Sequence, residues 1–294
     1  MARAASVPIA FALSWAAAAA GCSLLVDTAG LSEPLDASVR DAASVEAGEG
    51  GVDAATDGPK GDGGADAADA ATTAYRDAVL ADAPILYLRL DETTGTVAKD
   101  SSGKGNDGVY RAGCTLGVKG ALAAEGGTAV RFAGTSCAVE VRGIDFSGTS
   151  PFTLEAWTYH EGADAVFRHF INKDARPQTG REQWGVYLHT SNGLVFERYI
   201  ADSVFACSTT APANNAWSHI VATFDGSQLR LYVDGVLRDS KTDARPQAPK
   251  DVPLLIGASG GGGQWNGALD EVAIYPKALA PATVVRHYDL GRAP

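Results

Sequence analysis

Short segments in which hydrophobic and polar residues alternate recur from about residue 85 to residue 275. Gly, Asp, Asn and Ser separate them, and this punctuation is typical of a β-sandwich or a β-barrel. Asp234-Gly235, between two of the segments, predicts a type I′ hairpin turn, because both residue types tolerate positive φ. We expect strands at residues 85–90, 129–132, 138–141, 152–160, 166–172, 183–189, 194–200, 217–224, 229–233, 236–239, 253–256 and 268–275.

Two further segments carry helical signals. Residues 75–81 predict one or two turns of helix before the first strand. Residues 281–288 begin with Pro281 and are followed by Gly291, the usual start and stop residues of a helix. Since the sequence has no internal repeat, the pattern predicts one all-β domain over residues 74–294.

The region before this domain has a different pattern. Residues 5–21 contain no charge and follow Arg3, which indicates a secretory signal peptide, because the run is too short and too rich in Ala to span a membrane. Small residues directly before Cys22 resemble the bacterial lipobox, although Ala19 stands where that motif usually has Leu. We expect residues 1–21 to be a lipoprotein signal peptide and Cys22 to be lipidated. Ordinary cleavage by signal peptidase is the alternative.

Residues 22–73 have the composition of an acidic spacer. Between Asp27 and Thr73, eleven acidic residues stand against Arg40 and Lys60, and no aromatic residue occurs. Such a segment cannot bury enough apolar surface to offset chain entropy, so we expect a disordered Ala/Asp/Gly-rich linker. The linker carries most of the net charge of −11. The domain is then ordinary in charge, and no basic patch argues for nucleic acid.

Three cysteines remain in the domain: Cys114, Cys137 and Cys207. An exported protein meets oxidising conditions, so we expect one disulfide and one free thiol. We prefer a bridge between Cys114 and Cys137, which closes a loop of about two dozen residues. A bridge between Cys137 and Cys207, or no bridge, is the alternative.

Four motifs stand in a fixed order along the domain. They are YLRLDE at 87–92 with DSSGKGNDG at 100–108, FTLEAW at 152–157, WSHIVATFDG at 217–226 with LRLYVDG at 229–235, and WNGALDEVAIY at 265–275. In this order they resemble the laminin-G-like jelly rolls of the concanavalin A-like lectin/glucanase superfamily. The resemblance implies two packed antiparallel sheets, one of them concave, and it brings Cys114 and Cys137 close together near one sheet edge.

The superfamily includes glycosidases, which need two carboxylates about 5–10 Å apart. The glucanase relatives supply them from one strand as Glu-x-Asp-x-x-Glu, and this sequence has no such triplet. The pairs Asp91-Glu92 and Asp270-Glu271 are adjacent, so the two side chains of each pair would point to opposite faces of a strand. The histidines lack metal-ligand spacing, and we expect a protein without enzyme activity.

Strand alternation predicts a face for ligand binding. If the aliphatic faces of strands 152–160, 183–189 and 194–200 pack between the sheets, their other faces carry aromatic and polar side chains. Such side chains suit a sugar or peptide surface. Packing in the core or under loops is the alternative, and we expect Trp217 in the core. The predicted ligand residues are Glu155, Trp157, Tyr159, Tyr187, His189, Glu197 and Tyr199.

The resemblance also implies a structural calcium ion. Many members of the superfamily hold Ca²⁺ with an Asp of the last long strand and with backbone carbonyls near the first strand. Asp270 matches that position, and Asp91 lies on the strand expected beside it. Hard oxygen ligands suit Ca²⁺. In the alternative interpretation, Asp270 accepts hydrogen bonds from the backbone of a turn.

These features predict a surface-anchored, non-enzymatic binding or adhesion module for a glycan or an extracellular or envelope protein. Its membrane contact would be the lipid at Cys22 alone. Ser23, rather than an aspartate, follows Cys22. We therefore expect the protein to be located in the outer membrane or at the cell surface of a Gram-negative host. A glycan-active enzyme with an unrecognised site and a structural envelope protein are the alternatives.

The substitution Cys22→Ala tests the anchor. Without the thiol no lipid can be attached, so the protein should leave the detergent phase and accumulate as an unprocessed or soluble form. Phase partitioning of the wild-type and variant proteins measures this. Unchanged partitioning of the variant would contradict lipidation at Cys22.

Overall fold

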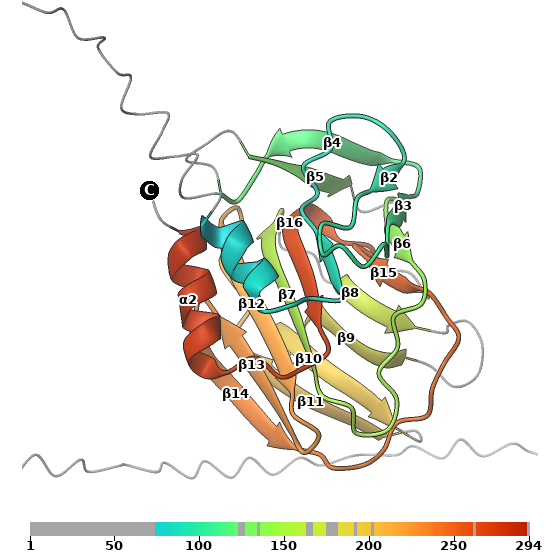
Figure 1. Cartoon of the computed structure of the whole chain (residues 1–294), viewed down its shortest axis with the longest axis vertical. Helices are drawn as coiled ribbons and strands as arrows, with labels where there is room; N and C mark the ends of the chain where they lie inside the picture. Colours follow the sequence, from blue (N-terminus) through green and yellow to red (C-terminus); the bar gives the residue numbers. More distant parts are fainter. Residues whose placement is uncertain are drawn as a thin grey trace, which may run out of the picture. The chain divides into compact units, whose positions relative to one another are not determined.

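Two antiparallel β-sheets pack face to face in the computed structural model (Figure 1). The structure describes residues 74–122, 127–133, 136–162, 167–174, 182–190, 193–200, 203–260 and 263–292, all within the compact unit Pro59–Pro294. The predicted all-β sandwich is confirmed. The predicted signal peptide, Cys22 and the linker lie outside the described residues.

Sheet A has the strand order β14-β13-β12-β7-β16-β5-β4, with β1 also paired to β16. Its strands are β1 (Leu86–Leu88), β4 (Cys114–Lys119), β5 (Thr128–Ala133), β7 (Phe152–His160), β12 (Trp217–Phe224), β13 (Gln228–Val233), β14 (Val236–Thr242) and β16 (Asn266–Tyr275).

Sheet B has the order β11-β10-β9-β8-β15-β6-β3-β2. Its strands are β2 (Val97–Ala98), β3 (Gly108–Tyr110), β6 (Val139–Val141), β8 (Arg168–Asp174), β9 (Glu182–His189), β10 (Gly193–Ile200), β11 (Ser203–Thr209) and β15 (Leu254–Ile256).

Alternation decides which side chains fill the space between the sheets, as predicted. Leu154 and Ala156 of sheet A and Val186 and Phe196 of sheet B are all buried in one core cluster. The rings of Phe152 and Trp184 meet there with their centroids 5.4 Å apart. The tight hairpin is also confirmed, because Asp234 and Gly235 have φ values of 53° and 74°.

The disulfide joins Cys114 to Cys137, as predicted, with a Cα–Cα distance of 4.7 Å. Cys114 begins β4 at the edge of sheet A, and Cys137 precedes β6 of sheet B, so the bridge ties the two sheets together. Cys207 is free and buried within β11. Burial raises the pKa of its thiol to about 12, which keeps the thiol protonated and unreactive.

Two helices cover part of the outer face of sheet A (Figure 1). The first spans residues 74–81, and α2 spans Pro281–Gly291. Gly291 was expected beyond the helix but lies inside it. The reason is packing, since a Cβ at Gly291 would come within 2.4 Å of the Trp157 ring. No helix among the described residues is long and apolar enough to cross a membrane.

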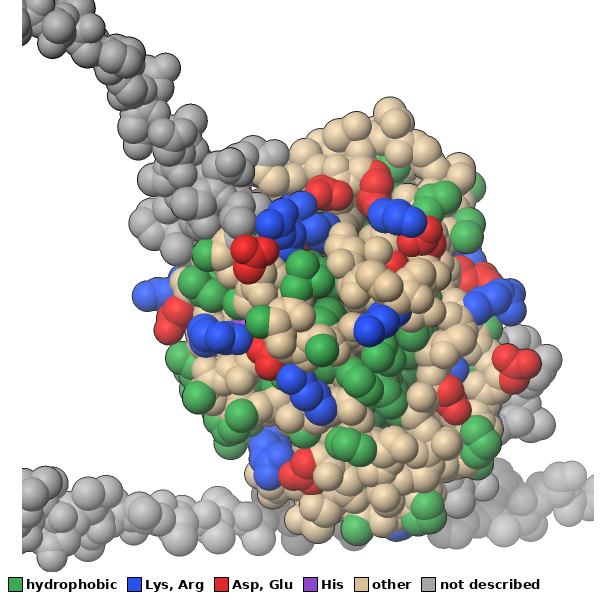
Figure 2. Space-filling model, in the orientation of Figure 1, with side chains coloured by type: hydrophobic (Ala, Val, Ile, Leu, Met, Phe, Trp, Pro, Cys, Tyr) green, Lys and Arg blue, Asp and Glu red, His purple; other side chains and the backbone are tan. Residues whose placement is uncertain are grey.

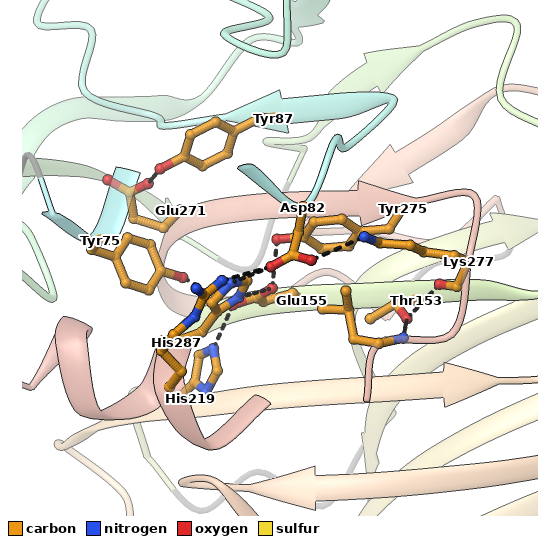
Figure 3. A network of polar contacts seen from close by, with 12 residues as sticks. Tyr75, Asp82, Tyr87, Thr153, Glu155, His219, Glu271, Tyr275, Lys277 and His287 are labelled. Atoms are coloured by element: carbon orange, nitrogen blue, oxygen red, sulfur yellow. Dashed lines mark hydrogen bonds and ion pairs between the residues drawn. The ribbon is translucent and has the colours of Figure 1, made fainter. Parts of the chain in front are cut away.

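A buried network of polar side chains holds these helices on the sheet (Figure 3). Its centre is the fully buried carboxylate of Glu155 on β7. Four side chains from four other elements surround it: Tyr75 Oη donates at 3.1 Å, Tyr275 Oη donates at 2.7 Å, His219 Nε2 lies at 2.8 Å, and His287 Nδ1 lies at 3.1 Å.

His287 of α2 lies between two carboxylates. Its Nε2 is 3.2 Å from Asp82, which also pairs with Lys277 and Arg286. Burial alone would lower the pKa of His287, but Glu155 and Asp82 outweigh it and raise the pKa above its ordinary value of 6.5. Burial alone would raise the pKa of Glu155, but His287 and His219 hold it well below 4.5. An imidazolium–carboxylate pair therefore joins α2 to sheet A.

This pair predicts a pH dependence of stability. The raised pKa of His287 gives stability that is complete below 6.5 and is lost as the pH rises through the folded value. The lowered pKa of Glu155 gives stability that is complete above 4.5 and is lost as the pH falls through the folded value. The pair should therefore contribute most to the free energy of unfolding between pH 4.5 and 6.5. Urea unfolding at a series of pH values measures this contribution.

The substitution His287→Gln should remove the loss on the alkaline side. It should also lower the free energy of unfolding by roughly 3 kcal/mol or more near pH 6, because it takes the main partner from a buried charge. His189→Gln on sheet B is the matched control, since it removes an imidazole outside the network. An unchanged pH profile in His287→Gln would show that the pair does not titrate as described.

Candidate functional site

The seven predicted ligand residues do not form one face. Glu155, Trp157 and Tyr159 belong to β7 of sheet A, whereas the other four belong to β9 and β10 of sheet B. Their side chains point away from the shared core, so they lie on opposite sides of the sandwich. The prediction of a single face is wrong because alternation fixes in or out but not the sheet to which a strand belongs.

The two helices cover the first part of the β7 face. Glu155 is fully buried in the network, and Trp157 is 4% exposed between Tyr288 and His219. Neither can reach a ligand, so both are structural. Tyr159 is the next outward residue of β7 and is half-buried. It lies beside Trp217, which is also half-buried and outward rather than in the core as predicted.

The outer face of sheet B brings aromatic and polar side chains together. On β8, β9 and β10, His169 pairs with Tyr187 and Tyr187 with Val195. In the next row, Asn172 pairs with Gly185 and Gly185 with Glu197. Tyr199 lies further along β10 and is half-buried. We call the following set the sheet B face: Phe167, His169, Asn172, Tyr187, His189 and Glu197.

Four rings form the aromatic part of the sheet B face. His169 and Tyr187 lie 4.7 Å apart, and Phe167 meets His189 edge-on at 4.5 Å. Phe167 is 47% exposed, which is unusual for so large an apolar side chain. Tyr187 Oη donates to Glu197 at 2.7 Å and thereby fixes the carboxylate beside the rings. Phe167 and the half-buried His189 are the accessible members of this group, whereas Glu197, His169 and Tyr187 are 2%, 3% and 7% exposed.

Asn172 is a polar residue whose side-chain amide lacks hydrogen-bond partners. Its side chain is fully buried, yet neither Nδ2 nor Oδ1 has a hydrogen-bond partner. Gly185 on the neighbouring strand leaves room for it, since a Cβ there would come within 3.2 Å of the Asn172 amide. An unpaired buried amide costs roughly 1–3 kcal/mol and calls for an explanation. Since Asn172 is 0% exposed, a ligand with hydroxyl or amide groups would satisfy it only after the side chains that cover it move aside.

Three residues of the sheet B face were not predicted: Phe167, His169 and Asn172. Strict alternation along β8 puts His169 and Ile171 on one face, but a bulge between them sends Ile171 into the core and leaves His169 and Asn172 outward. A run of four glycines at 260–263 in the sequence gives a partial signal. The carbonyl of Gly263, the last of them, accepts from the backbone N–H of His169 at 2.9 Å, so Gly263 lies beside the face.

The two predicted calcium ligands lie in different environments. Asp270 is 2% exposed, and its Oδ2 accepts from the backbone N–H of Ala121 at 2.8 Å, as in the alternative interpretation. Its Oδ1 has no hydrogen-bond partner. Burial and Glu271 raise the pKa of Asp270 well above its ordinary value. Asp91 instead pairs with Arg89 at 2.9 Å. Within the described ranges, no group of three or more His, Cys, Asp or Glu side chains could hold a metal.

Solved structures of similar fold include the binding domain of a mosquitocidal protein and binding domains of botulinum neurotoxins. The binding domain of Paraclostridial Mosquitocidal Protein 1 has a TM-score of 0.58 and 20% identity, over 71% of this chain and 52% of that one. The botulinum neurotoxin serotype D ligand-binding domain, in complex with N-acetylneuraminic acid, has a TM-score of 0.56 and 14% identity, over 73% and 52%. The chain thus spans about half of each. At this identity the likeness shows the fold.

Sequence comparison gives the family. No curated protein sequence matches the chain. A family profile described as the concanavalin A-like lectin/glucanases superfamily matches residues 133–285, more than half of the chain. The matched range holds most of both sheets. Three of the four sequence motifs lie within it. The chain belongs to the laminin-G-like family of the concanavalin A-like lectin/glucanase superfamily.

Proposed function

We propose that this protein is a non-enzymatic, glycan-binding module that uses the sheet B face. The observation that carries the proposal is Asn172, whose buried amide has no partner although it lies on the outer face of sheet B, in one row with Gly185 and Glu197. A sugar supplies hydroxyls for such an amide and an apolar C–H surface for the rings. The sialic-acid complex of a botulinum domain of the same fold supports a glycan as the ligand class.

Two carboxylates on the outer side of sheet B are too far apart for glycoside hydrolysis. On the outer side of sheet B, Glu197 and Glu140 are separated by β9, β8 and β15. Four strand spacings of about 4.8 Å put them roughly 19 Å apart, well beyond the ~5–10 Å that the reaction needs. Glu155 has histidine neighbours suited to proton transfer, but it is fully buried. The proposal therefore assigns no catalytic residue.

Presentation at the cell surface is part of the proposal. Cys22 would carry the lipid, and residues 22–73 would act as a solvated spacer between membrane and domain. No contact with nucleic acid is proposed. On the face shown in Figure 2, basic and acidic side chains are interspersed and do not gather by sign.

A glycan array followed by variants of the mature protein tests the proposal. Asn172→Ala should weaken glycan binding by about tenfold while leaving the melting temperature unchanged or higher, because it removes an unsatisfied buried amide. Phe167→Ala should weaken binding about three- to tenfold through loss of a ring contact worth ~1 kcal/mol. Leu237→Ala on β14, which is equally exposed at 49%, is the matched control.

Other results would contradict the proposal in distinguishable ways. Release of reducing sugar from a bound glycan would make the protein an enzyme. No binding to any glycan on the array, together with capture of a single envelope protein, would favour the alternative of a structural envelope protein. A large loss of stability in Asn172→Ala would show that the amide is part of the core.

Calcium binding remains a prediction, and it rests on Asp270. Its unpartnered, buried Oδ1 would be one ligand, and backbone carbonyls would supply most of the others. The ion would compensate a carboxylate that burial otherwise disfavours in its charged form. Asp91 is already engaged by Arg89.

Thermal unfolding with and without a chelator tests this prediction. If Ca²⁺ binds only the folded protein, added Ca²⁺ should raise the melting temperature by mass action, and a chelator should reverse the shift. Asp270→Asn should abolish the difference, whereas Asp239→Asn on the exposed strand β14 should retain it. Identical melting curves for the wild-type protein in Ca²⁺ and chelator would show that Asp270 only accepts from the backbone.

A further inference from the structure

A second group of side chains lies in register on the outer face of sheet A. Trp217 of β12 pairs with Tyr159 of β7, and Tyr159 pairs with Ala268 of β16. On its other side, Ala268 pairs with Arg131 of β5. Paired residues of neighbouring strands share a face, so these four side chains form one row across the sheet. The row lies further along β7 than Trp157, which α2 covers.

The small residue in this row leaves a pocket. Ala268 stands between Tyr159 and Arg131, whose Cα atoms are two strands or about 10 Å apart. The cavity measures about 260 Å³ and is also lined by Trp217 and Glu161. This volume lies just below the usual range of small-molecule sites, ~300–1,000 Å³. It suits a single ring better than an extended chain.

One side of the pocket is an aromatic wall. The rings of Tyr159 and Trp217 lie 5.5 Å apart at 58°, and both side chains are half-buried. Within the described part of the chain, neither the Tyr159 hydroxyl nor the Trp217 indole N–H has a hydrogen-bond partner. The wall therefore offers an apolar surface with polar groups free at its edge. Such a surface suits a ring that has C–H faces and hydroxyl edges.

The other side of the pocket carries a paired arginine and glutamate. Arg131 donates from Nε to the Glu161 carboxylate at 2.8 Å, and its Nη2 donates to the same group. This pairing raises the pKa of Arg131 and lowers the pKa of Glu161, so both side chains stay charged. The guanidinium keeps Nη1 as a further donor, and the carboxylate keeps lone pairs that can accept. The pair thus places a fixed donor beside a fixed acceptor.

The two charges of this pair cancel. Lys119, the nearest cation along β4, pairs with Thr128, three residues from Arg131 on β5, so its side chain lies on the opposite face of the sheet. An ionic ligand in the pocket would meet one attractive and one repulsive charge. A hydroxyl group can instead accept from the arginine and donate to the glutamate. The pocket therefore favours a neutral, hydroxylated ligand.

We propose that this pocket binds a single neutral pyranose, whose C–H face stacks on Tyr159 and Trp217 while two neighbouring hydroxyls contact Arg131 and Glu161. The site is separate from the sheet B face, because the two lie on opposite sides of the sandwich. It adds a second sugar contact to the proposed function and does not depend on binding at the sheet B face.

Calorimetric titration of the mature protein tests the pocket. The neutral probes are methyl glucoside and methyl galactoside, and their charged counterparts are methyl glucuronide and glucosamine. A neutral glycoside should bind at least tenfold more tightly than either charged sugar. Its affinity should change less than about twofold between roughly 0.1 M and 1 M salt, because a neutral ligand is not screened. Ala268→Val should weaken this binding tenfold or more by filling the floor of the pocket.

The substitution Glu161→Gln tests the cancelled charge. It keeps the shape of the side chain but leaves Arg131 as an unpaired cation. The variant should bind the neutral glycoside several-fold more weakly and methyl glucuronide several-fold more tightly than the wild-type protein does. A purely structural role of the pair would not move the two affinities in opposite directions. Glu140→Gln, which breaks a pair with Arg111 on sheet B, is the matched control and should change neither affinity.

Further variants separate the pocket from other effects. Ala244→Val adds the same two methyl groups at an exposed position and should bind as the wild-type protein does. Asn172→Ala should also leave binding of the neutral glycoside unchanged, so a failure of the sheet B face and a failure of the pocket can be told apart. Equal or tighter binding of the charged sugars would overturn the ligand class. Binding that survives both Ala268→Val and Glu161→Gln, or no binding of either neutral glycoside, would overturn the site.

Discussion

The contacts of the buried Glu155 carboxylate are the interaction on which the helical layer over sheet A depends. A charge at this depth is unfavourable unless it is surrounded by donors. Tyr75, His219, Tyr275 and His287 supply them from the first helix, β12, β16 and α2. Satisfying one carboxylate therefore fixes both helices on sheet A. A residue that resembles a catalytic acid or base in sequence serves as the attachment point of the helical layer.

That attachment decides which surfaces are left for ligands. The helices cover β7 as far as Trp157, and Gly291 is the residue that lets α2 approach the indole so closely. Beyond this point the sheet A row from Trp217 to Arg131 stays uncovered enough to enclose a cavity. On the opposite side, the sheet B face has no equivalent helix among the described elements. The end of the helical layer thus decides how much of the outer face of sheet A stays accessible.

On both outer faces a small residue makes room among larger ones. Gly185 leaves space for the Asn172 amide between β8 and β10, and Ala268 forms the floor between Tyr159 and Arg131. A larger side chain at either position would close the site while leaving the strand intact.

The sequence by itself determined the β-sandwich, the Asp234-Gly235 hairpin and the inward or outward direction of each residue in long strands such as 152–160, because these are local consequences of period-two alternation. Loop length, together with the family resemblance, favoured the Cys114–Cys137 bridge, which the structure contains. Strand β4, with the sequence CTLGVK, was missed although its side chains alternate strictly in burial. Only the tertiary structure decided that β7 lies in the opposite sheet from β9 and β10, that a bulge turns His169 and Asn172 outward, and that helices cover Glu155 and Trp157. These outcomes depend on pairings between distant segments, and alternation along one strand carries no information about its neighbours.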